Sequence, residues 1–209
     1  MRRVKLTMPS AQALLMEPVP IMVLSVLGSN LSTAGVTTVT IPAHADGDLI
    51  VAFGSNRTST VPPTPAGWTS IATGTANPFG TGSDRSTRMV YKFSDGSAQT
   101  LTFDSGSGTA STDPYSGCLI FRNAVGVDGA AGIDDTATGT TLAVPALTLT
   151  RYPSTVVAFS FYGGAITAAP AGWIVDNGMA YAEYLSAWAG GNFTLGTTAA
   201  LIGTVVEIY

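Results

Sequence analysis

The sequence predicts an all-β protein: an antiparallel two-sheet β-sandwich built from an internal duplication and preceded by an extended N-terminal arm. Three observations predict it. The 209 residues are poor in charge (11%) and rich in glycine (24), a composition that favours turns and strands over helices. Short apolar segments alternate with turn signals. The phrase "PAGW" occurs twice, ending at Trp68 and at Trp173.

The predicted N-terminal arm covers residues 1–35. It begins with three of the nine cationic side chains, and without them a net charge of −4 becomes −7 for the rest of the chain. Prolines interrupt its apolar stretch well short of the ~20 residues that span a bilayer. We expect the arm to pack on another subunit; the alternative is a first strand folded onto its own domain. The expected contact residues are Arg2, Arg3, Lys5, Leu6, Leu14, Leu15, Ile21 and Val23.

The first repeat is expected at residues 36–123, within a sandwich that covers 36–209. "VTTVTIP" (36–42) alternates as a half-buried strand should. "LIVAF" (49–53) is a continuous apolar run, too short for a helix and suited to a central strand. Further strands are expected at 68–73, 87–93, 99–103 and 115–123.

The second repeat is expected at residues 142–209, after a small, polar linker at 124–141. "VAF" recurs, and "PAGW" ends 15 positions after Phe53 and 14 positions after Phe159. "YAEYLSAW" takes the place of "TRMVYKF", and "ALIGTVVEIY" that of "YSGCLIFRN". Two repeats of four or five strands predict two facing sheets that share one core.

The repeated "PAGW" predicts a turn followed by a strand. Its glycine is able to adopt the positive φ that some turns require. The tryptophan then opens the next strand and is large enough to close the end of a sandwich core. We therefore expect Trp68 and Trp173 to be core anchors at equivalent places, with sugar-stacking platforms as the alternative.

Reactive side chains are scarce. Cys118 lies in the apolar "YSGCLIF" and is expected in the core. His44 is the only histidine, so a zinc site with several imidazoles is excluded, and a catalytic triad would have to use this loop residue. Glu183 and Glu207 fall on strands, where we expect them on the solvent face. We predict no enzyme and no cofactor. We also predict no metal site, because the aspartate-rich loops lack the spacing of a known calcium loop.

The order of the motifs resembles a family of jelly-roll β-sandwich proteins that is common among virion proteins of tailed bacteriophages. The resemblance covers residues 36–209 and is carried by "GDLIVAF", "PAGWTSIAT", "RMVYKFSDGSAQTLTF" and "CLIFRNAVGVDGA", followed by the second "VVAF" and "PAGW". It implies a jelly-roll sandwich and a role in capsid decoration, in a minor tail or fibre part, or in binding surface glycans. The family has no catalytic residues to carry over.

These observations lead to two functional expectations. The first is a virion structural protein, above all a capsid decoration or cement protein, assembled in the host cytoplasm as a homo-oligomer (a trimer is favoured) on major capsid or tail components. The acidic body argues against nucleic-acid binding, and no membrane contact is expected. The alternative is a carbohydrate-binding module of a tail or fibre, with glycan contacts at Phe79, Asp84, Arg85 and Tyr115.

Overall fold

The computed structural model describes residues 24–32, 37–56, 61–71, 81–82, 85–103, 116–160 and 165–209. Every regular element in these ranges is a β-strand, so the predicted all-β class is confirmed. The strands are β1 (Ser25–Leu31), β2 (Thr38–Thr40), β3 (Asp46–Asn56), β4 (Thr69–Ser70), β5 (Thr81–Gly82), β6 (Arg85–Asp95), β7 (Thr100–Thr102), β8 (Ser116–Arg122), β9 (Val127–Val144), β10 (Ser154–Ser160), β11 (Ile166–Ala168), β12 (Ile174–Asp176), β13 (Met179–Leu185) and β14 (Gly191–Ile208).

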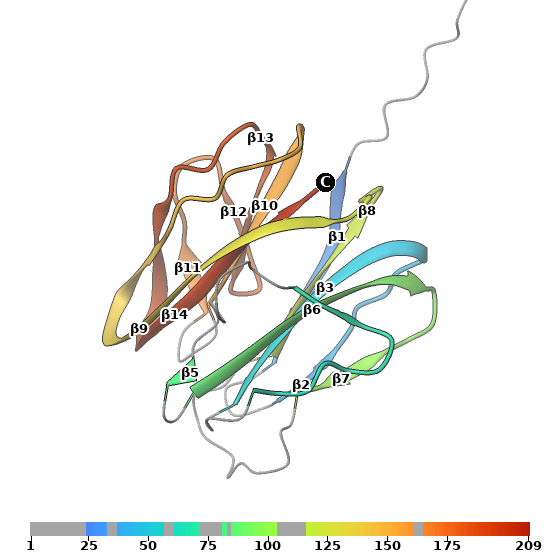
Figure 1. Ribbon diagram of the computed structural model, residues 1–209, viewed down its shortest axis with the longest axis horizontal. Coiled ribbons are helices and arrows are strands. Elements are labelled where there is room, and N and C mark those ends of the chain that lie inside the picture. Colours follow the sequence, from blue (N-terminus) through green and yellow to red (C-terminus); the bar gives the residue numbers. More distant parts are fainter. Residues whose placement is uncertain are drawn as a thin grey trace, which may run out of the picture.

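Each half of the chain builds one large antiparallel sheet (Figure 1). The first sheet has the order β1-β8-β3-β6-β4, with β5 added on β6. The second runs β9-β14-β10-β13-β12, with β11 added on β14. The two orders correspond strand by strand, as the duplicated sequence predicts. Both large sheets are antiparallel, as predicted, and β2 and β7 form a separate two-stranded sheet, while the jelly-roll connectivity remains a prediction.

The register extends this correspondence to single residues. Val51 pairs with Tyr91 and with Leu119 in the first sheet. Val157 pairs with Tyr181 and with Val206 in the second. The two triplets therefore occupy equivalent positions, and the same offsets make Met89 equivalent to Met179 and Phe121 to Ile208.

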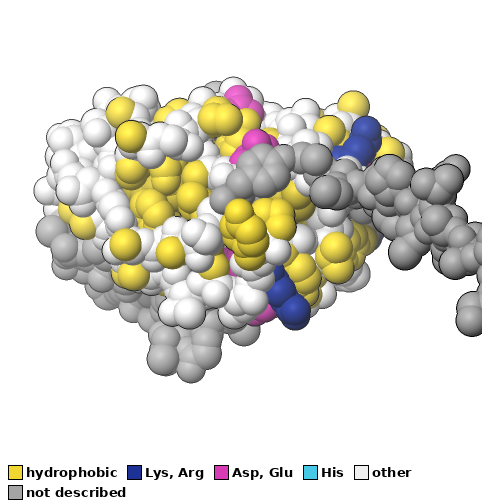
Figure 2. Space-filling view, turned by 90° about the horizontal axis from the view of Figure 1, so that it is seen from above, with side chains coloured by type: hydrophobic (Ala, Val, Ile, Leu, Met, Phe, Trp, Pro, Cys, Tyr) yellow, Lys and Arg dark blue, Asp and Glu magenta, His cyan; other side chains and the backbone are white. Residues whose placement is uncertain are grey.

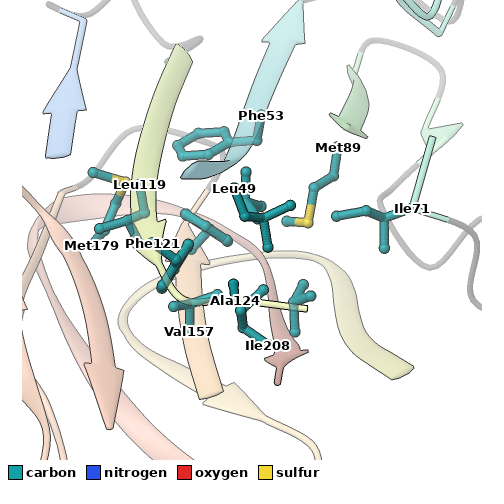
Figure 3. Close-up of a cluster of buried hydrophobic side chains, with 13 residues drawn as sticks. Leu49, Phe53, Ile71, Met89, Leu119, Phe121, Ala124, Val157, Met179 and Ile208 are labelled. Carbon is teal, nitrogen blue, oxygen red and sulfur yellow. The ribbon is translucent and has the colours of Figure 1, made fainter. Parts of the chain in front are cut away.

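The two sheets face each other across one shared core (Figure 3). Ten of its thirteen buried members form equivalent pairs from the two halves: Val51 with Val157, Phe53 with Phe159, Met89 with Met179, Leu119 with Val206, and Phe121 with Ile208. Alternation along the strands places these residues on the inner face of each sheet. Burial of both inner faces against each other joins the halves into one body.

Each sheet also buries part of its outer face. In the first half, β2 pairs with β7, and Phe103 covers a cluster that includes Cys118. Phe103 lies so close to Gly54 that a Cβ there would stand 2.0 Å from its ring, so only glycine fits. In the second half, the end of β9 supplies Leu142 and the start of β14 supplies Phe193 to an outer cluster that also contains Trp188.

Two predicted boundaries are wrong. The end of the predicted arm (residues 1–35) is strand β1, which pairs with β8 in the first sheet. The predicted linker (124–141) is mostly strand β9, which pairs along the length of β14. Small and polar residues indicate a loop when the chain is considered alone, but backbone pairing needs no particular side chain when a partner strand is available. Both strands also bring one valine, Val26 and Val127, against the shared core.

Candidate functional site

Most of the predicted contact residues lie outside the described residues. These are the arm residues Arg2, Arg3, Lys5, Leu6, Leu14, Leu15, Ile21 and Val23, and the proposed glycan contacts Phe79, Asp84 and Tyr115. For Arg85 the structure places the backbone, at the start of β6 opposite Gly82. The first described residue, Leu24, packs against the shared core beside β1, and β1 begins at the pair Ser25 and Arg122.

The two "PAGW" segments form the same turn. The Trp68 amide donates to the Pro65 carbonyl at 3.1 Å, and the Trp173 amide donates to the Pro170 carbonyl at 3.2 Å. Gly67 (φ 79°) and Gly172 (φ 87°) adopt the positive φ that the third position of a type II turn requires. The expected role of glycine is therefore confirmed.

The tryptophans that follow these turns are only half-buried. Trp68 packs against the outer cluster of the first half. Trp173 packs edge-on against Trp188 (4.8 Å between ring centroids) and Phe193 (5.0 Å) in the outer cluster of the second half. The buried indole is Trp188, whose Nε1 donates to the Pro145 carbonyl at 2.9 Å. Sequence reasoning missed Trp188 because it lies outside the two identical "PAGW" phrases.

The carboxylates with the least exposure hold the backbone in place. Glu207 is fully buried, so its predicted place on the solvent face is wrong. It accepts hydrogen bonds from the amides of Thr150 (2.9 Å) and Arg151 (3.0 Å) and from the Ser154 hydroxyl (2.6 Å). Ile120 occupies the equivalent position in the first half, so the duplication gives no sign of a carboxylate at position 207. The alternation of β14 also gives no sign that a carboxylate binds the amides of residues 150 and 151.

Asp48 and Arg122 form a side-chain link in the first half. The guanidinium donates through Nε to Oδ1 and through Nη2 to Oδ2, both at 3.0 Å, and the Ala45 amide donates to Oδ2 at 2.8 Å. These interactions, the Arg122 hydrogen bond above all, hold the pKa of Asp48 below its usual range although burial opposes them. Paired in this way, Asp48 is a structural carboxylate.

The remaining reactive groups are also committed to structure. Burial raises the pKa of the Cys118 thiol to about 12, so the nucleophilic thiolate is suppressed. His44 ties two turns together: its Nδ1 lies 2.6 Å from the Pro42 carbonyl and its Nε2 lies 3.0 Å from the Ser97 carbonyl. Among the described residues, no three His, Cys, Asp or Glu side chains are grouped so that they could hold a metal ion.

One end of the sandwich exposes large apolar side chains. The amide of Val125 (72% exposed) donates to the Tyr209 carbonyl, and the Tyr209 ring lies under the Arg151 guanidinium at 4.9 Å. Tyr152 (73% exposed) follows Arg151 in the chain. We call Val125, Arg151, Tyr152 and Tyr209 the terminal surface. The view from above in Figure 2 shows a face on which hydrophobic and uncharged side chains predominate. Arg122, opposite the first residue of β1, lies three positions before Val125 in the chain.

A second feature is a groove of about 200 Å³ on the seam between the two halves. Strand β4, Ile71 and Tyr91 line one side, and Val127, Asp128 and Gly129 line the other. Asp128 is held by the Thr150 hydroxyl (2.5 Å) and its side chain is 38% exposed. We call this feature the seam groove.

The chain has no counterpart in three comparisons: no family model, no curated protein and no solved structure matches it. The described part of the chain has no helix long and apolar enough to cross a bilayer. Function must therefore be argued from the terminal surface and the seam groove.

Proposed function

We propose that this chain is a non-enzymatic structural component of a tailed-phage particle, of the decoration or cement type, which attaches to neighbouring subunits through the terminal surface and the N-terminal segment beside it. The observation that carries the proposal is the joint position of these two features. Val125 and Tyr152 are the two most exposed large hydrophobic side chains among the described residues, and the first described strand, β1, begins opposite Arg122, three positions before Val125 in the chain.

The physical basis of such attachment is burial of surface. Removing apolar area from water contributes about 25 cal/mol per Å² before the costs of association are subtracted. The exposed side chains of Val125 and Tyr152 supply apolar area, whereas Arg122 and Arg151 are each paired with an aspartate, Asp48 and Asp128. The acidic groups with least exposure, Asp48 and Glu207, are committed to the fold, which supports a role in adhesion over one in catalysis.

The first test is the composition of the particle. Mass spectrometry of purified particles from the phage that carries this gene should find the chain in fixed proportion to the major capsid or tail protein. Its absence from complete particles would overturn the proposal.

The second test concerns the surface. Particles that lack the chain should bind the purified wild-type protein, whereas Val125→Asp and Tyr152→Asp should each reduce binding at least tenfold. Ile174→Asp is the matched control, because Ile174 is an exposed apolar side chain (48%) on β12, outside the terminal surface. If all three variants bind equally well to the particles, the terminal surface does not mediate attachment.

A further inference from the structure

The two halves meet at two equivalent seams, and the seams differ. In the first, which we call the closed seam, β1 lies beside β12 and hydrogen bonds join them. In the second, the start of β9 and strand β4 line the seam groove of about 200 Å³. Because the same sandwich forms with a groove at the second seam, closure of the first is not required by the fold.

Three side-chain hydrogen bonds join the closed seam. The Ser29 hydroxyl donates to Asp176 Oδ2 at 2.5 Å, and Asn177 Nδ2 donates to the Ser29 hydroxyl at 2.8 Å and to the Ser29 carbonyl at 3.2 Å. At the second seam the register places Ala130 where Ser29 stands. It places Ile71 where Asp176 stands. Two of the three hydrogen bonds therefore depend on the carboxamide of Asn177.

The turn that carries this carboxamide needs a particular dipeptide. Asn177 and Gly178 connect β12 to β13, between the paired residues Asp176 and Met179. Both have a positive φ, 46° and 75°, as the two central residues of a type I′ hairpin turn must. Asparagine tolerates this conformation, and a Cβ on Gly178 would stand 2.4 Å from the Cβ of Ala165, so only glycine fits there. The turn therefore retains an Asn-Gly step, the only one in the sequence.

An Asn-Gly step is chemically labile, because glycine has no side chain to hinder attack by its own nitrogen. In this reaction the Gly178 amide nitrogen gives its proton to a solvent base and attacks Asn177 Cγ. The Cγ–Nδ2 bond breaks, and ammonia leaves with a proton from solvent. Water then opens the remaining succinimide to aspartate or isoaspartate. Asn177 is exposed, so water and base reach it.

We propose that Asn177 is a self-modification site, where loss of the side-chain amide opens the closed seam and the closed seam in turn limits the rate of that loss. The product carboxylate has no proton to donate to Ser29, and it adds a second negative charge beside Asp176. Before the reaction, two hydrogen bonds hold the carboxamide on Ser29, and they must break before Cγ turns toward the Gly178 nitrogen. This inference goes beyond the proposed function.

The test is peptide mapping by mass spectrometry, with separation of asparagine, aspartate and isoaspartate, after incubation of the full-length chain at mildly alkaline pH. Asn177 should lose its amide at least tenfold faster than Asn30. Asn30 is the internal control, because its side-chain amide also donates to a carbonyl, that of Thr40 at 2.6 Å, but leucine follows it. Ser29→Ala should speed the loss at Asn177 about two- to tenfold, the factor that one ordinary hydrogen bond gives.

Two variants test the effect on the seam. Asn177→Asp reproduces the aspartate product, and Asn177→Gly keeps the turn but removes the carboxamide. Hydrogen exchange should quicken in both at the amides of β1 and β12, while the amides of β2 and β7 exchange as in the wild type. Circular dichroism and the thermal midpoint establish that each variant is folded.

Three results would overturn the proposal. They are an amide at Asn177 that lasts as long as that of Asn30, a rate unchanged by Ser29→Ala, and wild-type exchange of β1 in both Asn177 variants. None of them bears on particle attachment, which is measured with Val125 and Tyr152 variants.

Discussion

Phe53 and Phe159 are equivalent residues of the two halves, and their rings pack against each other in the centre of the shared core, with centroids 4.9 Å apart and planes at 52°. Both rings are fully buried. Each half therefore places its own copy of the "VAF" phenylalanine against the other copy, and this contact lies where the two sheets meet. The unfolding of one half should expose the core of the other.

The first prediction concerns this pair. Phe53→Ala and Phe159→Ala should each lower the free energy of unfolding by about 3–5 kcal/mol, because each leaves a cavity in a close-packed core. Urea denaturation should show one cooperative transition in both variants. Phe93→Ala, at a 42% exposed position on β6, is the control and should cost about 1 kcal/mol or less. Two separate transitions would contradict a shared core.

The second prediction concerns the buried carboxylate. Glu207→Gln replaces one acceptor oxygen with an amino group that faces backbone donors, so it should destabilise the fold by about 1–3 kcal/mol. Hydrogen exchange should quicken at the amides of Thr150 and Arg151, which donate to Glu207. Glu183→Gln, at a half-buried site on β13, is the comparison. Unchanged exchange at both amides would show that Glu207 does not hold this segment.

The third prediction is a dependence of stability on pH. The pKa of Asp48 is lowered in the folded protein, chiefly by the hydrogen bond from Arg122. Its ionised form therefore stabilises the fold above the unfolded pKa of about 3.9, and this contribution is lost as the pH falls through the lower folded pKa. Asp48→Asn should be less stable at neutral pH but should lose less stability between neutral pH and about pH 3 than the wild type.

The thermal midpoint across this pH range measures the effect. Arg122→Gln removes the main cause of the lowered pKa and should flatten the profile in the same way. If either variant shows the same dependence of the thermal midpoint on pH as the wild type, another acidic group causes the loss of stability at low pH.

The fourth prediction concerns the only cysteine. Burial raises the pKa of Cys118 to about 12, and the side chain is inaccessible. Ellman's reagent at about pH 8 should therefore leave the native protein unmodified over minutes and react fully in concentrated guanidinium chloride. Rapid reaction under native conditions would contradict the packing of Cys118 beneath Phe103.

The fifth prediction separates two roles of glycine. A Cβ added at Gly172 would meet no other atom within 4 Å, but the backbone there has a φ of 87°. Gly172→Ala should therefore cost about 1–2 kcal/mol through backbone strain alone. Gly54→Ala forces a methyl group into the Phe103 ring and should cost more. Chemical denaturation measures both losses. Phe103→Ala removes the Cγ and Cδ2 atoms that the added methyl group would meet, so Gly54→Ala and Phe103→Ala together should cost less than the sum of the two single losses, whereas Gly172→Ala and Phe103→Ala should be additive.

The sequence by itself determined the features that depend on local patterns. Alternation and turn residues identified the strand class, and the repeated "VAF" and "PAGW" identified the duplication and the turn glycines. These signals are local because period-two alternation and positive φ are properties of a few consecutive residues. The seam groove produced no such signal, since its lining residues come from three separate segments of the chain, at 69–71, 91 and 127–129.

The tertiary structure alone decided which segments have partners. Residues 124–141 are small and polar like a loop, but β14 supplies a partner for the whole of β9, and pairing satisfies the backbone whatever the side chains are. The end of the predicted arm became β1 for the same reason. Glu207 lies on a strand with no sequence sign of burial, yet the 150–151 amides need an acceptor once water is excluded. Edge pairing and burial depend on residues distant in the chain, and so a local pattern does not contain them.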